Sequence, residues 1–299
     1  GLHHGVGQAI HLVQGIALRF SLGAGAVFFV SALLIPTTMM RLFTPDPELI
    51  SLGATYLRLV SLSYLCWSIS EVYMSSLRSV ERVTICTVLN LIAFACNILL
   101  NAVFIFGLFG APKLGVAGVA LGTTLSRLIL LAGCFIVSAR SRNVKIRFSY
   151  LFRSNKALVR DFIRMALPAL LNDISWGVAF SLYSAIIGHL DNDAVAAYSL
   201  VNVVRQFGTV LCFAVGSASG IILGNMLGDG QVEKARESAK KLMIMTIVTA
   251  LMGSCIVLIL IPVMQRFADL TPQALKYLKK MMLINSYYVI GAAVNTTLI

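Results

Sequence analysis

The chain has 299 residues, of which 58% are hydrophobic and only 12% charged, and its mean hydropathy is +0.88. Because soluble globular domains carry roughly 25% charged residues, this composition excludes an ordinary soluble domain. The net charge of +12 alone would suit a nucleic-acid partner, but the distribution of the basic residues along the chain favours another explanation.

Eight apolar runs follow one another along the chain. They cover residues 20–40, 56–77, 84–107, 114–138, 162–187, 196–224, 242–264 and 277–299. A helix that crosses a bilayer needs about 20 mostly apolar residues. The sequence therefore predicts an all-α polytopic membrane protein with eight spans.

The connections between these runs alternate in charge. Most Lys and Arg residues lie in the connections 1–19, 78–83, 139–161 and 225–241. The connections 41–55, 108–113, 188–195 and 265–276 hold only Arg41, Lys113, Arg266 and Lys276. Since cytoplasmic connections are rich in Lys and Arg, the first set is predicted to be cytoplasmic and the second to lie outside. The positive charge thus reflects topology, and no nucleic-acid partner is expected.

An internal repeat relates the beginning of the chain to its end. Residues 7–70 resemble residues 230–293, because the pairs Gly-Gln, Ile-Pro, Thr-Pro, Tyr-Leu and Ser-Tyr recur in the same order at offsets between 221 and 227. Both copies have the same predicted sidedness, which indicates a parallel repeat. The runs within 84–138 have no later copy, and those within 162–224 have no earlier one.

A repeat of this length predicts two pseudo-symmetric lobes of six helices each. Residues 1–138 would form four of the six helices of an N-terminal lobe, and residues 162–299 four of the six of a C-terminal lobe. The basic stretch 139–161 would be the cytoplasmic linker. Two helices are then expected before Gly1 and two after Ile299.

Several motifs resemble those of the multidrug and toxic compound extrusion (MATE) transporters. SSLRSV at 75–80 and the stretch 90–127, with its Asn-Ile-Leu-Leu-Asn, Ile-Phe-Gly and Gly-Val-Ala-Gly-Val-Ala segments and a late Arg, are similar to the family's first lobe. LPALLNDISWG at 167–177, AVAAYS at 194–199 and IILGNMLGDGQVEKA at 221–235 resemble its second lobe. One departure is Leu130, where many relatives carry an acid.

The resemblance implies a secondary active antiporter that exports amphipathic, cationic drugs or metabolites in exchange for H⁺ or Na⁺. It implies a small-molecule substrate, a multi-pass protein of the bacterial plasma membrane, and no cofactor beyond the coupling ion; a monomer is expected. A lipid-linked saccharide flippase of the same superfamily is the alternative, and its cavity would be more basic. A membrane-embedded enzyme is disfavoured, since the sequence has no His box, paired acidic motif or nucleophile motif; no catalytic residue or metal site is predicted.

Asp173 is the main candidate for a substrate- or ion-binding residue. A charged group near the centre of a spanning helix costs about 2.5–3.5 kcal/mol, so it usually faces a cavity or a partner. Around it on the same predicted helix lie Asn172, Trp176, Phe180, Tyr183 and Ser184. An acid among aromatic rings can hold a cation and can exchange a proton. The alternative is a structural hydrogen bond to backbone freed by Pro168.

Other polar groups at membrane depth are further candidates. Tyr198, Asn202, Arg205 and Gln206 form a stripe that is predicted to line a cavity, the alternative being contacts with neighbouring helices. Glu71 and Arg127 lie at similar depth and are predicted to form an ion pair, with a structural role or a transport role. Two polar sets are expected mainly to hydrogen-bond between helices; they are Asn90, Asn97, Asn101 and Asn285, Tyr288, Asn295.

Two stripes of glycine are predicted to allow close packing of helices. The residues recur every four positions, which places each set on one helical face; they are Gly118, Gly122 and Gly216, Gly220, Gly224.

Overall fold

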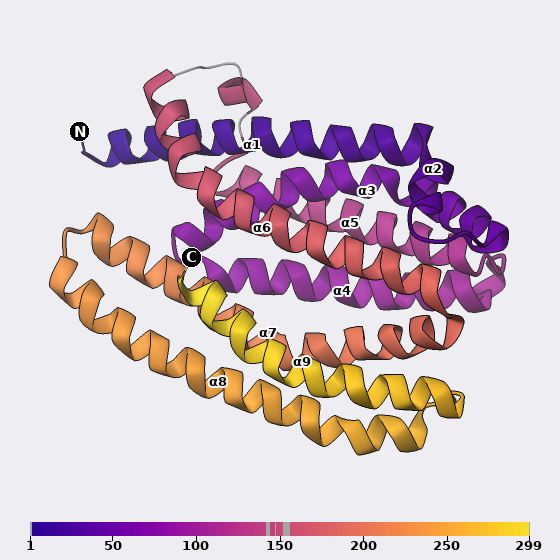
Figure 1. The fold of residues 1–299 in the computed structure, drawn as a ribbon. Coiled ribbons are helices and arrows are strands. Elements are labelled where there is room, and N and C mark those ends of the chain that lie inside the picture. The colour runs from indigo at the N-terminus through magenta and orange to yellow at the C-terminus, as the bar shows by residue number, and fades with distance from the viewer. Residues whose placement is uncertain (1, 142–143, 147, 152–155, 299) are drawn as a thin grey trace. The chain divides into compact units, whose positions relative to one another are not determined.

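The structure, a computed structural model, describes residues 2–141, 144–146, 148–151 and 156–298. These residues form helices and no strand (Figure 1). The helices are α1 (Leu2–Leu34), α2 (Pro36–Arg41), α3 (Pro47–Ser79), α4 (Val83–Phe106), the 3-10 turn η1 (Leu108–Gly110), α5 (Val116–Arg140), the 3-10 turn η2 (Phe148–Leu151), α6 (Lys156–Leu190), α7 (Asn192–Gly228), α8 (Val232–Phe267) and α9 (Pro272–Leu298). The predicted all-α architecture is confirmed.

Seven of the eight predicted spans are confirmed as helices long and apolar enough to cross a membrane. They are α1, α3, α4, α5, α6, α7 and α8. The eighth predicted run forms α9, but its described part does not reach the same hydropathy, because residues such as Asn285, Asn295 and Thr297 dilute its apolar character. That α9 crosses the membrane stays a prediction.

The helices extend well beyond the apolar runs. Residues 1–19 are predicted to be a connection, and this is wrong, because α1 begins at Leu2. Its early part has its own apolar contacts, with Ile16 and Leu18 only 2% and 4% exposed. Likewise, most of the predicted connection 225–241 is helical, since α7 ends at Gly228 and α8 begins at Val232.

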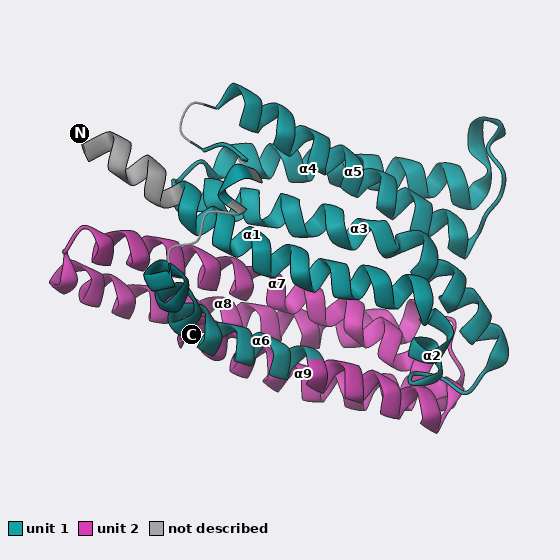
Figure 2. Ribbon diagram, turned by 90° about the horizontal axis from the view of Figure 1, so that it is seen from above, with its two compact units in different colours: residues 1–177 teal, residues 178–299 magenta. Residues whose placement is uncertain are grey.

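The chain divides into two compact units, residues 1–177 and 178–299 (Figure 2). The division falls inside α6, whereas the sequence places residues 156–161 of this helix in the linker and residues 162–190 in the C-terminal lobe. Only 6% of the most apolar stretch of α6 is buried, which is the lowest value among the seven candidate spans. Because α6 has so few contacts with the other described helices, its contacts do not assign it to one unit. The predicted lobe boundary at 139–161 therefore stays a prediction.

Unit 1 is built around α3 and α5. The helix α3 packs against α1, α2 and α5, and α5 also packs against α4. The core between them is apolar, with Tyr73, Leu77 and Cys134 at most 1% exposed. The linker segment before η2 joins this core through Val144, whose backbone oxygen accepts a hydrogen bond from the Tyr73 hydroxyl at 3.4 Å.

Unit 2 is a bundle in which α7, α8 and α9 all pack against one another. Its core is fully buried and aliphatic; it includes Val201, Val257, Leu278, Met282 and Val289. Two glycines bring α7 and α8 together. A Cβ atom at Gly208 would lie 3.2 Å from the Gly253 carbonyl oxygen, and one at Gly253 would collide with the Gly208 carbonyl oxygen.

The glycine stripes are confirmed only in part. A Cβ atom at Gly118 would lie 2.8 Å from the Phe104 carbonyl oxygen, and one at Gly216 would lie 2.6 Å from the Thr296 methyl group. A Cβ atom at Gly122 would collide with the side-chain oxygen of Asn101. Gly220 and Gly224 face open space among the described residues, so the packing prediction is wrong for these two within unit 2.

The two copies of the predicted repeat each form a pair of packed long helices but differ at the first proline. In unit 1 the chain breaks at Ile35, before Pro36, and α3 begins at Pro47 after a Thr-Pro pair. In unit 2 the corresponding Pro262 lies inside α8, and α9 begins at Pro272 of the second Thr-Pro pair. The paired helices are α1 with α3 and α8 with α9, and each pair packs together.

Candidate functional site

Unit 2 contains an arginine held between aromatic rings. The guanidinium carbon of Arg205, on α7, lies 4.2 Å from the centre of the Phe180 ring and 5.8 Å from that of Tyr288. These two rings come from α6 and α9 and meet edge to face at 5.9 Å. Cation–π contacts of this kind stabilise a positive charge away from water. The cluster therefore fixes a cation where three helices meet.

Tyr198 links α6 and α7 beside this arginine. Its ring meets that of Tyr183 edge to face at 5.1 Å, and its hydroxyl lies 3.4 Å from the hydroxyl of Ser184. Tyr198 itself is 7% exposed, whereas Tyr183 is 46% exposed. Tyr198 thus serves as a buried anchor, and Tyr183 presents an accessible ring.

Asn202 and Gln206 flank Arg205 on α7. The side-chain oxygen Oδ1 of Asn202 is buried and accepts no hydrogen bond from the described residues. Leaving a buried polar atom unsatisfied costs about 1–3 kcal/mol, which marks it as an acceptor for a ligand or water. Gln206 is exposed. The predicted stripe on α7 therefore combines a half-buried cation, a buried acceptor atom and an exposed amide.

Asp173 lies on α6, which runs without interruption past Pro168. Its side chain is exposed, while those of Asn172 and Trp176 are half-buried. Among the described residues, Asp173 forms no ion pair and accepts no side-chain hydrogen bond. A structural bond to backbone freed by the proline is thus not seen among the described residues, and the role of Asp173 in binding stays a prediction.

The predicted ion pair between Glu71 and Arg127 is wrong, because each residue has another partner. Glu71 pairs with Arg78, two turns further along α3. Arg127, on α5, instead places its guanidinium carbon 3.8 Å above the Trp67 ring of α3. A partner on the same helical face needs no particular helix packing, so the local pair forms more readily than the pair between helices.

Two of the three asparagines of unit 1 contact another helix as predicted. The amide nitrogen of Asn97, on α4, donates to the Ser126 hydroxyl of α5 at 3.2 Å. Asn90 makes a longer contact of 3.7 Å with the Met74 sulfur of α3. Asn101 instead donates to Asn97 at 3.2 Å within α4, and its buried Oδ1 accepts no hydrogen bond from the described residues.

Sequence reasoning missed one feature of this region. Tyr288 is expected mainly to hydrogen-bond between helices, with contact to substrate as the alternative, yet its ring lies beside the Arg205 guanidinium. The position of Tyr288 along α9 does not indicate which aromatic ring of α6 it contacts. No cluster of three His, Cys, Asp or Glu residues that could hold a metal ion occurs in the described part of the chain.

The family model MatE matches residues 7–103 and 168–299, which is most of the chain. The chain belongs to the MatE family. Curated proteins of similar sequence have names that agree with this. The probable multidrug resistance protein YoeA of Bacillus subtilis is 24% identical over 234 residues, which are 77% of this chain and 50% of YoeA. The multidrug resistance protein MdtK of Yersinia enterocolitica is 24% identical over 263 residues, which are 86% of this chain and 56% of MdtK.

Solved structures of MatE-type transporters share the fold. An outward-facing multidrug resistance MATE transporter of the MOP superfamily matches with a TM-score of 0.73 at 18% identity, over 99% of this chain and 71% of that protein. The eukaryotic MATE transporter AtDTX14 matches with the same TM-score, and the match covers 69% of AtDTX14. These relatives are transporters and not enzymes. The chain spans about half the length of the curated MatE relatives named here.

Proposed function

We propose that this protein is an antiporter that exports amphipathic, cationic drugs or metabolites in exchange for H⁺ or Na⁺. Asp173 carries the proposal, because it is an exposed carboxylate without a counter-ion among the described residues, inside a spanning helix. Membership of the MatE family and the names of the multidrug resistance relatives support the same function.

A single carboxylate is sufficient for exchange. At membrane depth a bare negative charge is costly, so Asp173 is stable only when a cation, a proton or water compensates it. A bound organic cation and a bound H⁺ or Na⁺ neutralise the same charge and therefore compete. Transport in opposite directions follows when each occupant leaves from a different side.

The rest of the α6 face suits an amphipathic cargo. Trp176 and Asn172 flank the acid, and Phe180 and Tyr183 continue the aromatic surface along the helix. Flat aromatic rings contact apolar parts of a ligand with little loss of side-chain entropy, and amide groups orient it. On α7, Asn202 and Gln206 are proposed to line the same kind of solvated wall, and the buried Tyr198 is proposed to hold α6 beside it.

A lipid-linked saccharide flippase is the second candidate. One observation favours it, namely that Arg205 and Arg127 are both kept at membrane depth by aromatic rings. Anionic pyrophosphate-linked cargo would need such positive charges. The two functions differ in the sign of the cargo, and Asp173 favours the exporter.

The test is transport by the purified protein in liposomes. A fluorescent organic cation inside the vesicles should leave faster when a gradient of H⁺ or of Na⁺ is imposed, and one of the two gradients should suffice. Release of the cation that ignores both gradients would contradict coupling. Movement of an anionic lipid-linked saccharide without movement of the cation would favour the flippase. The proposal also expects a monomer in the bacterial plasma membrane.

A further inference from the structure

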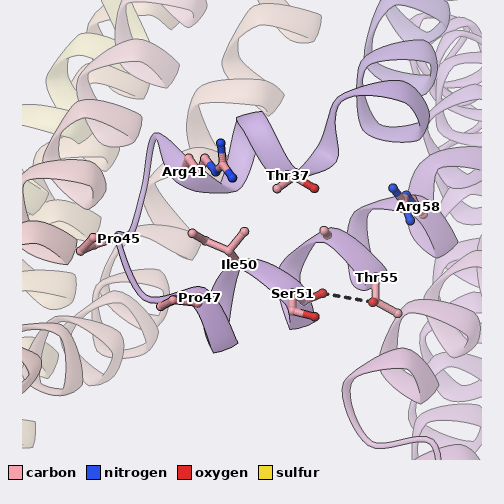
Figure 3. Close-up of a pocket in the computed structure, with 9 residues that line it drawn as sticks. Thr37, Arg41, Pro45, Pro47, Ile50, Ser51, Thr55 and Arg58 are labelled. Carbon is pink, nitrogen blue, oxygen red and sulfur yellow. Dashed lines mark hydrogen bonds between the residues drawn. The ribbon is translucent and has the colours of Figure 1, made fainter.

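A cavity of about 530 Å³ lies inside unit 1, where α2 turns into α3 (Figure 3). Its volume is within the range of about 300–1,000 Å³ that is typical of small-ligand sites. The lining side chains that carry polar groups are Thr37, Arg41, Ser51, Thr55 and Arg58. None of them belongs to the residues proposed for transport, so the cavity needs its own explanation.

Two positive charges border the cavity and are not neutralised. Arg41 ends α2, and Arg58 lies on the third turn of α3. Both side chains are exposed, and neither forms an ion pair with a described residue. The acid nearest in the chain, Asp46, caps α3 by accepting a hydrogen bond from the Glu48 backbone N–H at 2.9 Å. No carboxylate lines the cavity.

Hydroxyl groups complete the polar wall. Ser51, Thr55 and Arg58 follow at intervals of four and three residues, so they share one face of α3. Thr37 comes from α2, on the other side of the cavity (Figure 3). The hydroxyl of Thr55 donates to the Ser51 carbonyl oxygen at 3.1 Å. The hydroxyls of Thr37 and Ser51 have no hydrogen bond to a described residue and are available as donors.

The cavity also lies at a suitable depth. The charge distribution of the connections predicts that the α2–α3 turn lies on the outer side of the membrane. The 33 residues of α3 extend over about 50 Å, whereas the hydrocarbon core is about 30 Å thick. The first turns of α3 can therefore lie at the level of phospholipid headgroups.

We propose that this cavity binds a phosphate group, carried either by the headgroup of an anionic phospholipid or by free phosphate. Planar guanidinium groups present parallel N–H donors that match phosphate oxygens in two-point contacts. Arg41 and Arg58 lie on different helices at opposite ends of the cavity (Figure 3), so a phosphate group can accept from the guanidinium at either end, with Thr37 and Ser51 between them as further donors. Such a ligand would hold α2 against α3 at the membrane surface.

Native mass spectrometry of the purified full chain tests the proposal. The probes are dioleoyl phosphatidylglycerol, dioleoyl phosphatidylcholine as the uncharged comparison, and inorganic phosphate. We expect the double variant Arg41→Gln/Arg58→Gln to lose bound anion at least tenfold. The matched control is Lys113→Gln/Arg266→Gln, which removes two positive charges from the same predicted side outside the cavity and should bind as the wild type does.

The outcomes separate the two sources of the anion. Preferential binding of phosphatidylglycerol that inorganic phosphate does not displace identifies a headgroup site, and displacement by phosphate identifies a site for the free anion; both support the proposal. Equal binding by wild type and the cavity variant overturns it, and so does an equal loss in the control. If the Gln variant does not fold, Arg41→Lys/Arg58→Lys replaces it, with several-fold weaker binding expected and unchanged binding contradicting the site.

Discussion

At the scale of single residues, both units place an arginine over an aromatic ring. Arg127 lies over Trp67 in unit 1, and Arg205 over Phe180 in unit 2. The ring shields a charge that would be costly in the membrane, so a helix can carry an arginine at depth without an acid beside it. This explains why neither arginine needs the carboxylate that a simple pairing of charges would assign to it.

Replacement of the ring beneath Arg205 should therefore destabilise unit 2. We expect Phe180→Leu to cost about 0.5–2 kcal/mol beyond the loss of apolar contact, measured as a lower melting temperature of the purified protein in detergent. Phe213→Leu is the matched control, because Phe213 is 41% exposed on α7 and contacts no arginine among the described cation–π pairs. An equal decrease in both variants would show that Arg205 gains nothing from the ring.

The partner of Glu71 can be identified by double-mutant cycles. Glu71→Gln combined with Arg78→Gln should show a coupling energy of about 0.2–1 kcal/mol, small because the two side chains are 40% and 31% exposed. Glu71→Gln combined with Arg127→Gln should show a smaller coupling energy, because these two residues form no direct ion pair in the structure. Chemical unfolding in detergent provides the free energies. Stronger coupling to Arg127 than to Arg78 would restore the pair predicted from the sequence.

At the scale of helices, close approach depends on which glycines face a neighbour. Spacing every four residues predicts a common face but not what that face meets. Gly216 lies against Thr296, whereas Gly220 and Gly224 of the same stripe meet no described atom. Among the described glycines of unit 2, the least room for a Cβ atom is at Gly253, against Gly208, and neither residue is part of the predicted stripe.

A methyl group at the α7–α8 crossing should disrupt unit 2. Gly253→Ala places a Cβ atom against the Gly208 carbonyl oxygen, and backbone cannot move aside as a flexible side chain can. We expect a loss of about 1–3 kcal/mol in the free energy of unfolding. Gly220→Ala should be neutral or stabilising by up to about 1 kcal/mol, because alanine favours helix and its methyl group meets open space. Thermal unfolding compares the two, and an equally stable Gly253→Ala variant would contradict the packing.

At the scale of the whole molecule, hydropathy and charge were sufficient to predict an all-α membrane protein, and the motifs between residues 75 and 235 were sufficient to predict its family. Spans are readable because each must be apolar by itself. Side-chain partners cannot be read from the sequence in this way, because they depend on how the helices are rotated relative to one another. Phe180 and Tyr288 are far apart in the chain, yet their rings both contact the Arg205 guanidinium. No local sequence pattern predicts this contact. The early part of α1 was missed because its helix continues beyond the apolar run.

The most direct test of the proposed exchange is the variant Asp173→Asn, which removes the charge and keeps the shape. Gradient-driven efflux of the fluorescent cation from liposomes should fall at least tenfold, as expected when an interaction worth about 1.4 kcal/mol or more is lost. Asp161→Asn is the control, since it alters another exposed acid near the start of the same helix and should leave efflux unchanged. Normal coupled efflux by a well-folded Asp173→Asn protein would contradict the role of Asp173.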